Sequence, residues 1–123
     1  MNEEGMKLDT NKSRLELISP LAIVMMANVL TDGAVKYEDH NWRKGLKFSR
    51  IIGGILRHSV ALLAGINLDK ETRRHHAAHL MCEAMFLIEL DYTRSDLDDR
   101  FVYEGDVKDL LESLLADVSS NKI

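Results

Sequence analysis

The spacing of apolar side chains along the chain predicts helices rather than strands. Apolar residues recur three and four positions apart over long stretches, which is the repeat of an amphipathic helix, and no segment alternates at the two-residue period of a strand. We predict helices over residues 20–37, 50–64 and 71–92, and a fourth that starts at Gly105 and Asp106. Because the connections are short, the expected fold is all-α, a small antiparallel four-helix bundle.

Residues with strong terminal preferences mark the ends of these helices. Ser19 precedes Pro20, and this pair predicts a helix start because serine accepts the free amides and proline is tolerated in the first turn. Ser49 is expected to cap the second helix, and Gly65 is expected to end it in the left-handed conformation. Asp106 is the expected cap of the fourth helix. The apolar stripe of that helix consists of Val107, Leu110, Leu111, Leu114, Leu115 and Val118.

Two adjacent glycines interrupt the second helix. Gly53 and Gly54 each cost about 1 kcal/mol relative to alanine inside a helix. We therefore expect close approach by another backbone or by a ligand at this point.

The chain is expected to form one domain over residues 1–123, because no repeat or Pro/Gly-rich linker divides it. We divide it into a docking arm (1–18), core helices (20–92), and an acidic turn with a C-terminal helix (93–123). The arm has apolar side chains able to dock: Leu8, Leu15, Leu17 and Ile18. Residues 21–27 are apolar on nearly every side of their helix, which predicts oligomerisation through helix faces, as a homodimer or homotetramer.

Composition and charge narrow the class of protein. Apolar residues make up 46% of the chain and charged residues 29%, as in a folded globular protein. The net charge of −4 argues against binding long nucleic acid, whereas a local basic cluster suits a small phosphate-bearing molecule. No apolar run approaches the roughly 20 residues of a membrane span, and no export signal is evident. The single Cys82, among apolar neighbours, is expected to be buried rather than nucleophilic, and a reducing cytoplasm fits.

The third predicted helix places His76, His79 and Glu83 on one face, at spacings of three and four residues. Imidazole and carboxylate groups that converge in this way can bind a divalent cation or act as acid and base on a phosphate ester. The alternative is a solvated polar face. Phosphate-loop, dinucleotide-binding, His-Asp and Cys-x-x-Cys motifs are all absent from the sequence.

A polar loop over residues 36–45 is the densest group of functional side chains. Its aromatic and amide side chains can stack on a base and bond to a base or sugar, its basic ones can neutralise phosphates, and its carboxylates can hold a hard cation. These residues are Lys36, Tyr37, Glu38, Asp39, Asn41, Trp42, Arg43 and Lys44. The structural alternative is that Trp42 closes the end of the bundle while the charges are solvated.

An ordered series of short motifs resembles a known family. The series comprises Lys12 to Pro20, Gly33-Ala34-Val35-Lys36-Tyr37, Asn41-Trp42-Arg43-Lys44-Gly45, Leu56-Arg57-His58, and His76-Ala77-Ala78-His79 with Glu83. On these residues, from about 7 to 92, the chain resembles the phage dATP/dGTP diphosphohydrolases, relatives of the MazG-like all-α nucleotide pyrophosphohydrolases. The C-terminal helix lies outside the resemblance.

The resemblance implies hydrolysis of a purine deoxynucleoside triphosphate between its α and β phosphates, with Mg²⁺ or Mn²⁺ as cofactor, in the cytoplasm of a host cell if the chain is phage-encoded. The MazG-like motifs Glu-Glu-x-x-Glu and Glu-x-x-Asp are not intact here. Glu83 takes the place of the aspartate in the second motif, and His79 falls near its glutamate. Histidine ligands would shift the metal preference from Mg²⁺ toward Mn²⁺ or another transition ion.

The resulting hypothesis gives each candidate residue a role. The proposed catalytic residues are Glu83, His79 and Glu38, and the proposed metal ligands are Glu83, His79, His76, Asp39 and Glu38. Phosphates are assigned to Lys36, Arg43, Lys44 and Arg57, the base and sugar to Tyr37, Asn41 and Trp42, and further possible contacts to Lys12, Arg14, Glu16 and His58. A non-catalytic nucleotide-binding or scaffolding oligomer, or a helical protein–protein adaptor, stays open as an alternative.

Overall fold

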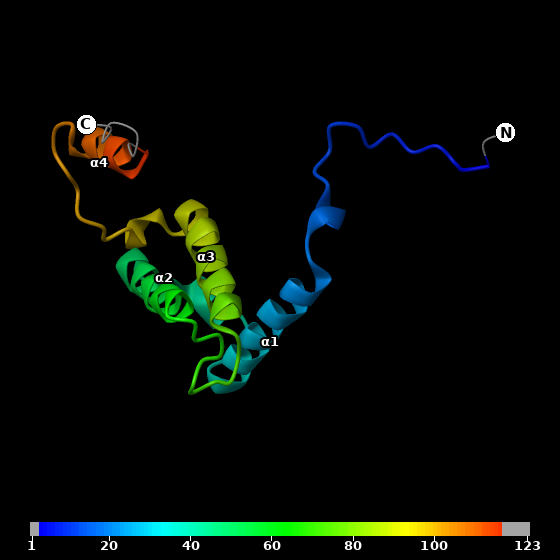
Figure 1. Ribbon diagram of the computed structural model, residues 1–123, viewed down its shortest axis with the longest axis horizontal. Coiled ribbons are helices and arrows are strands. Elements are labelled where there is room, and N and C mark those ends of the chain that lie inside the picture. Colours follow the sequence, from blue (N-terminus) through cyan, green and yellow to red (C-terminus); the bar gives the residue numbers. More distant parts are fainter. Residues whose placement is uncertain (1–2, 117–123) are drawn as a thin grey trace.

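The computed structural model describes residues 3–116 and is all-helical (Figure 1), which confirms the predicted fold class. The four helices are α1 (Pro20–Lys36), α2 (Phe48–Leu63), α3 (His76–Thr93) and α4 (Val107–Ala116). Short 3₁₀ turns cover Leu15–Leu17, Asn41–Lys44 and Ser95–Leu97. Within the described residues, β pairing is limited to one isolated bridge between Leu68 and His75.

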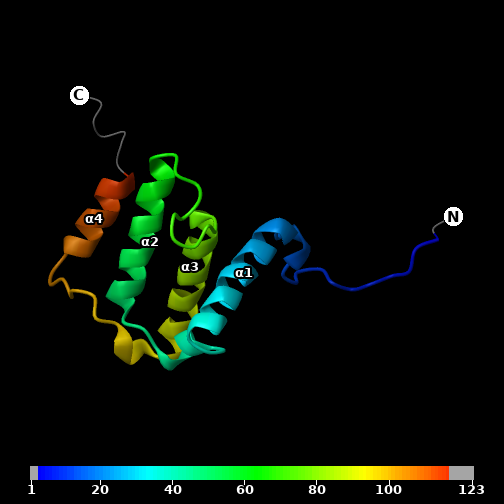
Figure 2. The ribbon, with the colours of Figure 1, turned by 90° about the horizontal axis from the view of Figure 1, so that it is seen from below.

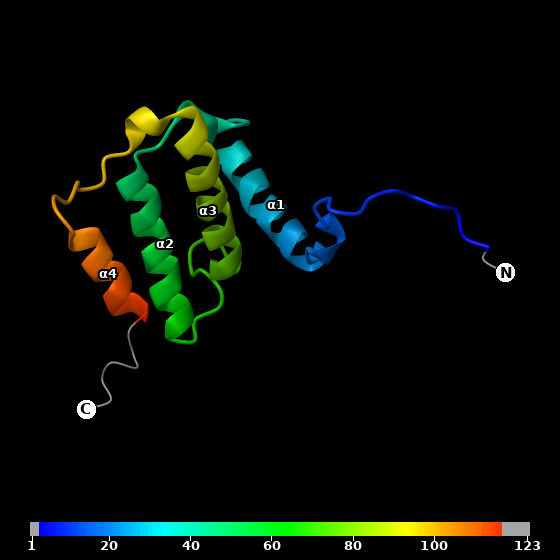
Figure 3. The ribbon, with the colours of Figure 1, turned by 90° about the horizontal axis from the view of Figure 1, so that it is seen from above.

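Helix α3 lies at the centre of the packed part of the molecule. It lies beside α2, which runs in the opposite direction, and α1 packs against its other side (Figures 2 and 3). The core between α2 and α3 is formed by the buried side chains of Phe48, Ile51 and Leu90. The half-buried side chains of Trp42, Ile55, Phe86, Leu87 and Leu97 pack around it. Helix α4 lies beyond α2, and all ten of its residues are exposed.

The structure confirms two of the predicted helix ends. Ser19 caps α1, because its Oγ accepts a hydrogen bond from the amide of Ala22 at 3.1 Å, and Pro20 follows as the first helical residue. Gly65 follows α2 with a φ of +82°, and the amide of Ile66 donates to the carbonyl of Ala61 at 2.9 Å, as in a Schellman ending.

The predicted cap of α2 is wrong, because the helix starts one residue earlier than Ser49, with Lys47 at its cap position. The amide and the hydroxyl of Ser49 instead both donate to the carboxylate of Asp99. Nearby, the Arg94 guanidinium donates to the carbonyl of Lys44 at 2.7 Å. Residues 94–99, although distant in the sequence, are therefore hydrogen-bonded to residues at the start of α2 and just before it.

The predicted start of the third helix at residue 71 is also wrong, because α3 begins at His76. The Asp69 carboxylate accepts hydrogen bonds from the amides of Glu71 and Thr72, and this favours a turn over a helix. His75 then caps α3, since its Nδ1 accepts from the amide of Ala77 at 3.0 Å.

Much apolar surface of this single chain stays in contact with solvent. Helix α1 has no buried residue, and the arm projects away from the helices with Leu8, Leu15 and Leu17 at least 71% exposed (Figure 1). The apolar stripe of α4 is exposed over Val107 to Leu115, and Val118 lies outside the described residues. None of the described helices has the length and apolarity to cross a membrane.

The prediction that Cys82 is buried is confirmed. Its Sγ lies 3.4 Å from the carbonyl of Met26 and donates to it, so the thiol contacts α1. Burial, with the negative charge of Glu83, raises the pKa of this thiol to about 11. A thiol with such a pKa is a poor nucleophile at neutral pH.

The two glycines of α2 give a matched test of the packing between α2 and α3. A methyl group on Gly54 would lie 2.1 Å from Oε1 of Glu83, whereas one on Gly53 would meet only the end of the Arg57 side chain, at 3.3 Å. We expect Gly53→Ala to raise the free energy of unfolding by up to about 1 kcal/mol. Gly54→Ala should be less stable than Gly53→Ala by about 1–3 kcal/mol in urea unfolding, because it must displace a buried carboxylate. Equal stabilities would show that the two helices lie farther apart.

Candidate functional site

Two contacts, one helical turn apart, join α2 to α3. Gly54 faces the carboxylate of Glu83, and one turn further along both helices the ring of His58 stacks on the ring of His79, with centroids 4.9 Å apart and an interplanar angle of 4°. The close approach expected at the glycines is therefore present at Gly54, and the neighbour is a side-chain carboxylate rather than a backbone or a ligand. The absence of a side chain at Gly54 leaves room for Glu83 between the helices.

Glu83 holds a buried acceptor without a donor. Its Oε2 is buried and has no hydrogen-bond partner among the described residues. Burial raises the pKa of this carboxyl above its ordinary value, and the nearby positive charge of Arg57 partly opposes that rise. An unpartnered buried carboxylate oxygen costs free energy, and such groups are concentrated at functional sites.

Three histidines gather at the start of α3. Nδ1 of His58 lies 2.8 Å from Nδ1 of His76, and the His58 ring also stacks on that of His79. Burial lowers the pKa of both His58 and His79, and the charge of their histidine neighbours lowers it further. The structure thus joins His76 and His79 through His58, which the sequence identified only as a possible contact.

Asp69 is the residue of this site that the sequence analysis missed. Its Oδ1 accepts from the amides of Glu71 (2.8 Å) and Thr72 (3.0 Å), and these bonds lower the pKa of the carboxyl. Its Oδ2 lies 4.0 Å from Nδ1 of His76. The signal in the sequence is an aspartate seven residues before the first helical histidine, but it lies in a stretch that the sequence predicts as a connection.

The donor groups of this cluster fit a divalent cation. One ligand atom each from His58, Asp69 and His76 lies within 4.8 Å of the other two, and all three side chains are half-buried. Two imidazoles with one carboxylate suit Mn²⁺ or another transition ion better than Mg²⁺, which prefers oxygen ligands. Nε2 of His79 lies instead 2.7 Å from the hydroxyl of Thr72.

The loop after α1 forms a second group, in which the charged side chains pair with one another. Lys44 forms an ion pair with Glu38, and Arg43 forms one with Glu89 of α3. The Arg43 guanidinium also lies over the Trp42 ring, at 4.6 Å from its centroid.

The Trp42 ring stacks on Phe86 at 4.7 Å and packs against the core. The structure therefore places Trp42 where the packing alternative expects it. Beside it, the Lys36 ammonium lies 5.3 Å from the centroid of the exposed Tyr37 ring, and Asn41 is half-buried.

The histidines and the loop after α1 contact α3 at different positions along its axis. Glu89 follows His76 by 13 residues, which corresponds to roughly 20 Å along a helix, and Glu83 lies between them. Glu38, which pairs with Lys44, and its neighbour Asp39 therefore lie toward the end of α3 that is far from the histidines. Lys12 and the ion-paired Arg14 and Glu16 lie on the projecting arm, apart from both groups.

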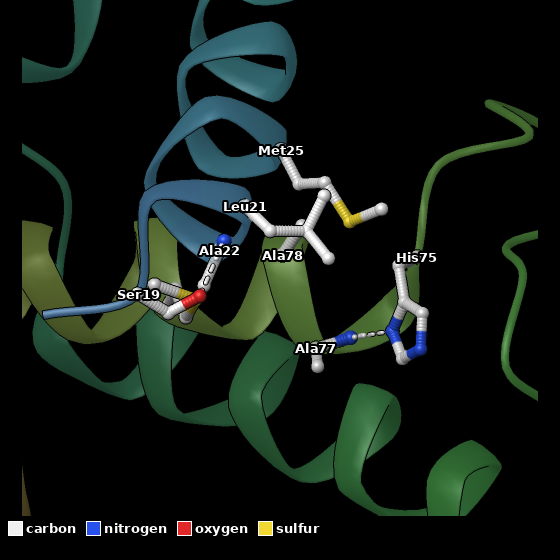
Figure 4. A pocket seen from close by; sticks show the side chains of 8 residues that line it. Ser19, Leu21, Ala22, Met25, His75, Ala77 and Ala78 are labelled. Carbon is white, nitrogen blue, oxygen red and sulfur yellow. Dashed lines mark hydrogen bonds between the residues drawn. The ribbon is translucent and has the colours of Figure 1, made fainter.

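A separate hollow lies between α1 and α3. It has a volume of about 170 Å³ and is lined mainly by apolar side chains, with Ser19 and His75 at its edge (Figure 4). Ser19 and His75 both accept hydrogen bonds from backbone amides as helix caps. This hollow therefore offers no charged group to a phosphate.

Comparisons with known proteins agree on one family. The family model described as "dATP/dGTP diphosphohydrolase, N-terminal" matches residues 2–100. A protein of Salmonella phage PMBT28 named "dATP/dGTP diphosphohydrolase" is 40% identical over 96 residues, which is 78% of this chain and 33% of the phage protein. The chain thus spans about a third of the length of that relative. No solved structure matches the chain significantly.

The burial of Glu83 predicts a specific pH dependence of stability. Because burial raises its pKa, the folded protein keeps the carboxyl proton to a higher pH than the unfolded chain, in which the pKa is near 4.5. Stability should therefore fall as the pH rises from about 4.5 through the folded-state pKa. Glu83→Gln removes this titration, so the variant should match the wild type at pH 4 and exceed it increasingly at pH 6 and pH 8.

Urea unfolding at the three pH values measures the effect. The matched control is Glu112→Gln, because Glu112 is exposed on α4, and its difference from the wild type should stay constant with pH. A constant difference for Glu83→Gln as well would contradict the burial of this carboxyl.

Proposed function

Because the chain belongs to the dATP/dGTP diphosphohydrolase family, we propose that it hydrolyses dATP and dGTP between the α and β phosphates. The products would be the monophosphate and pyrophosphate. The proposal rests on the family match over residues 2–100 and on the name of the phage relative, of which this chain spans about a third. The site of reaction would be the cytoplasm of a host cell.

The structural observation that carries the proposal is the half-buried Glu83 side chain, whose Oε2 is buried. A raised pKa makes a carboxylate a better general base near neutral pH. Among the described residues, Oε2 of Glu83 has no hydrogen-bond partner. In the proposed step, water adds to one of the two phosphorus atoms joined by the α–β bridging oxygen, and its proton passes to Oε2 of Glu83. The bond from that phosphorus to the bridging oxygen breaks, which separates the monophosphate from pyrophosphate. The reaction needs no covalent intermediate.

A divalent cation, Mg²⁺ or Mn²⁺, would polarise the phosphates and lower the pKa of the attacking water. The residues whose donor atoms fit such a cation are His58, Asp69 and His76. His79 would act beside them, since it lies one turn from Glu83 on α3 and stacks on His58.

In this proposal the basic residues would hold a triphosphate by exchanging their present partners for phosphate. Arg43 and Lys44 are paired with carboxylates at exposed positions, and such pairs contribute little stability, so phosphate can replace the carboxylate. Arg57 lies near Glu83, and Lys36 lies at the end of α1. Tyr37 presents an exposed ring and Asn41 an amide to the base or sugar, whereas Trp42 would support them from the core side.

Product analysis tests this function directly. Incubation with each common deoxynucleoside triphosphate, and with Mg²⁺ or Mn²⁺, should yield the monophosphate and pyrophosphate from dATP and dGTP, and a chelator should stop the reaction. Glu83→Gln should lower the rate at least about 10²-fold, because removal of a general base costs that much. The exposed Glu112→Gln should keep the wild-type rate.

Three other outcomes of these experiments would contradict the proposed function or the role of Glu83. A wild-type rate in Glu83→Gln would remove Glu83 from the mechanism. Triphosphate binding in calorimetry without pyrophosphate release would favour a nucleotide-binding module instead, and the absence of any nucleotide affinity would favour an adaptor.

We also propose that the chain is a homodimer or homotetramer. Its accessible surface is 10484 Å², whereas a compact monomer of 14.0 kDa exposes about 6,700 Å². The excess is roughly 3,800 Å² per chain, to which the projecting arm contributes, and it is larger than the roughly 1,000–2,500 Å² that each partner buries in an obligate interface. The exposed apolar face of α1, with Leu21, Ile23 and Val24, is the surface proposed for the contact.

Sedimentation analysis of the full chain tests the assembly. We expect a mass of two or four chains, and we expect Val24→Asp to weaken association at least tenfold because it places a charge in an apolar interface. The control is Tyr92→Asp, which adds the same charge at an exposed ring near the end of α3 and should leave the mass unchanged. A monomeric wild-type protein would overturn the proposal.

A further inference from the structure

We propose that His58, Asp69 and His76 form a site for one transition-metal ion, and that this site binds Mn²⁺ or Co²⁺ in preference to Mg²⁺. The role of this site in turnover rests on the proposed hydrolysis, whereas its affinity for the metal does not. Two of the three ligands come from different helices and the third comes from the connection between them.

The two imidazoles already face each other as ligands of one ion would. Nδ1 of His58 and Nδ1 of His76 lie 2.8 Å apart, so in the metal-free protein a single hydrogen must lie between them. A cation that replaces this hydrogen would contact both nitrogens at once. Ligands about 2.0–2.2 Å from an ion lie roughly 3–4.4 Å from one another, and a small widening of the pair reaches that range.

The third ligand is held in place by its own hydrogen bonds. Because Oδ1 of Asp69 is occupied by the amides of Glu71 and Thr72, the free atom is Oδ2, which lies 4.0 Å from Nδ1 of His76. Bonds of this kind to the non-ligating oxygen orient a ligand carboxylate. The Oδ2 atom therefore completes a set of two nitrogens and one oxygen on one side of an ion.

Contacts outside the cluster fix the segment that carries Asp69. The Arg74 guanidinium binds both carboxylate oxygens of Asp32 on α1, at 2.8 and 3.1 Å, and so ties the connection to a third helix. The stack of His58 on His79 sets the orientation of the His58 ring. Preorganised ligands of this kind lose little freedom when the metal binds.

The identity of the donors determines which metal is preferred. Imidazole nitrogen binds transition ions well, whereas Mg²⁺ selects oxygen ligands and retains its water. Of the three donors, two are imidazole nitrogens. The site should therefore bind Mn²⁺ and Co²⁺ in preference to Mg²⁺.

Metal titration of the full chain tests the site without reference to activity. We expect CoCl₂ to bind the metal-free protein with one ion per chain and a visible absorption band, and millimolar MgCl₂ should fail to displace it. His58→Gln, Asp69→Asn and His76→Gln should each lower the Co²⁺ affinity at least tenfold, with helix content by circular dichroism unchanged. His40→Gln and Asp91→Asn change the same residue types at exposed positions elsewhere and should bind Co²⁺ like the wild type.

Other results would overturn the proposal. Co²⁺ affinity that is equal in the wild type and the three ligand variants would exclude the site, and displacement of Co²⁺ by equimolar Mg²⁺ would exclude its selectivity. Co²⁺ binding as expected in a protein that releases no pyrophosphate keeps the metal site and removes the proposed hydrolysis. Pyrophosphate release at the wild-type rate by Asp69→Asn, despite lost Co²⁺ affinity, would exclude a role of the site in turnover.

Discussion

The placement of one half-buried carboxylate between two helices is the constraint on which the site depends. Glu83 fits between α2 and α3 only because Gly54 has no side chain, and the same spacing brings His58 against His79 one turn away. Hydrophobic packing of Phe48, Ile51 and Leu90 holds the helices together near their other ends. The apolar core thus offsets the cost of keeping an acceptor unpartnered.

The features that the sequence predicted well are those decided by neighbouring residues. Ser19 caps the amide three residues later, and Gly65 supplies a left-handed residue directly after α2. Ser49 failed as a cap because its partner, Asp99, lies 50 residues away. Local spacing carries no information about such a contact, so only the folded chain could reveal it.

The same distinction explains what was found and missed in the candidate site. The helical repeat places His76, His79 and Glu83 on one face, because all three belong to one helix. His58 joins them from another helix, and Asp69 joins them from a turn whose amides compete with helix formation. The loop with Arg43 could be recognised as a group of functional residues, but its distance along α3 from the histidines could not be read from the sequence.

The hydrogen bonds of Asp99 bear on where the folding unit ends. Because Asp99 binds the start of α2 and Arg94 binds the carbonyl of Lys44, residues 94–99 are part of the same cooperative unit as the helices. The family match also ends at residue 100, just after these contacts, and α4 follows with all its residues exposed. The unit that packs together and matches the family therefore extends to about residue 100, whereas α4, with all its residues exposed, adds little to the packing of α2 and α3.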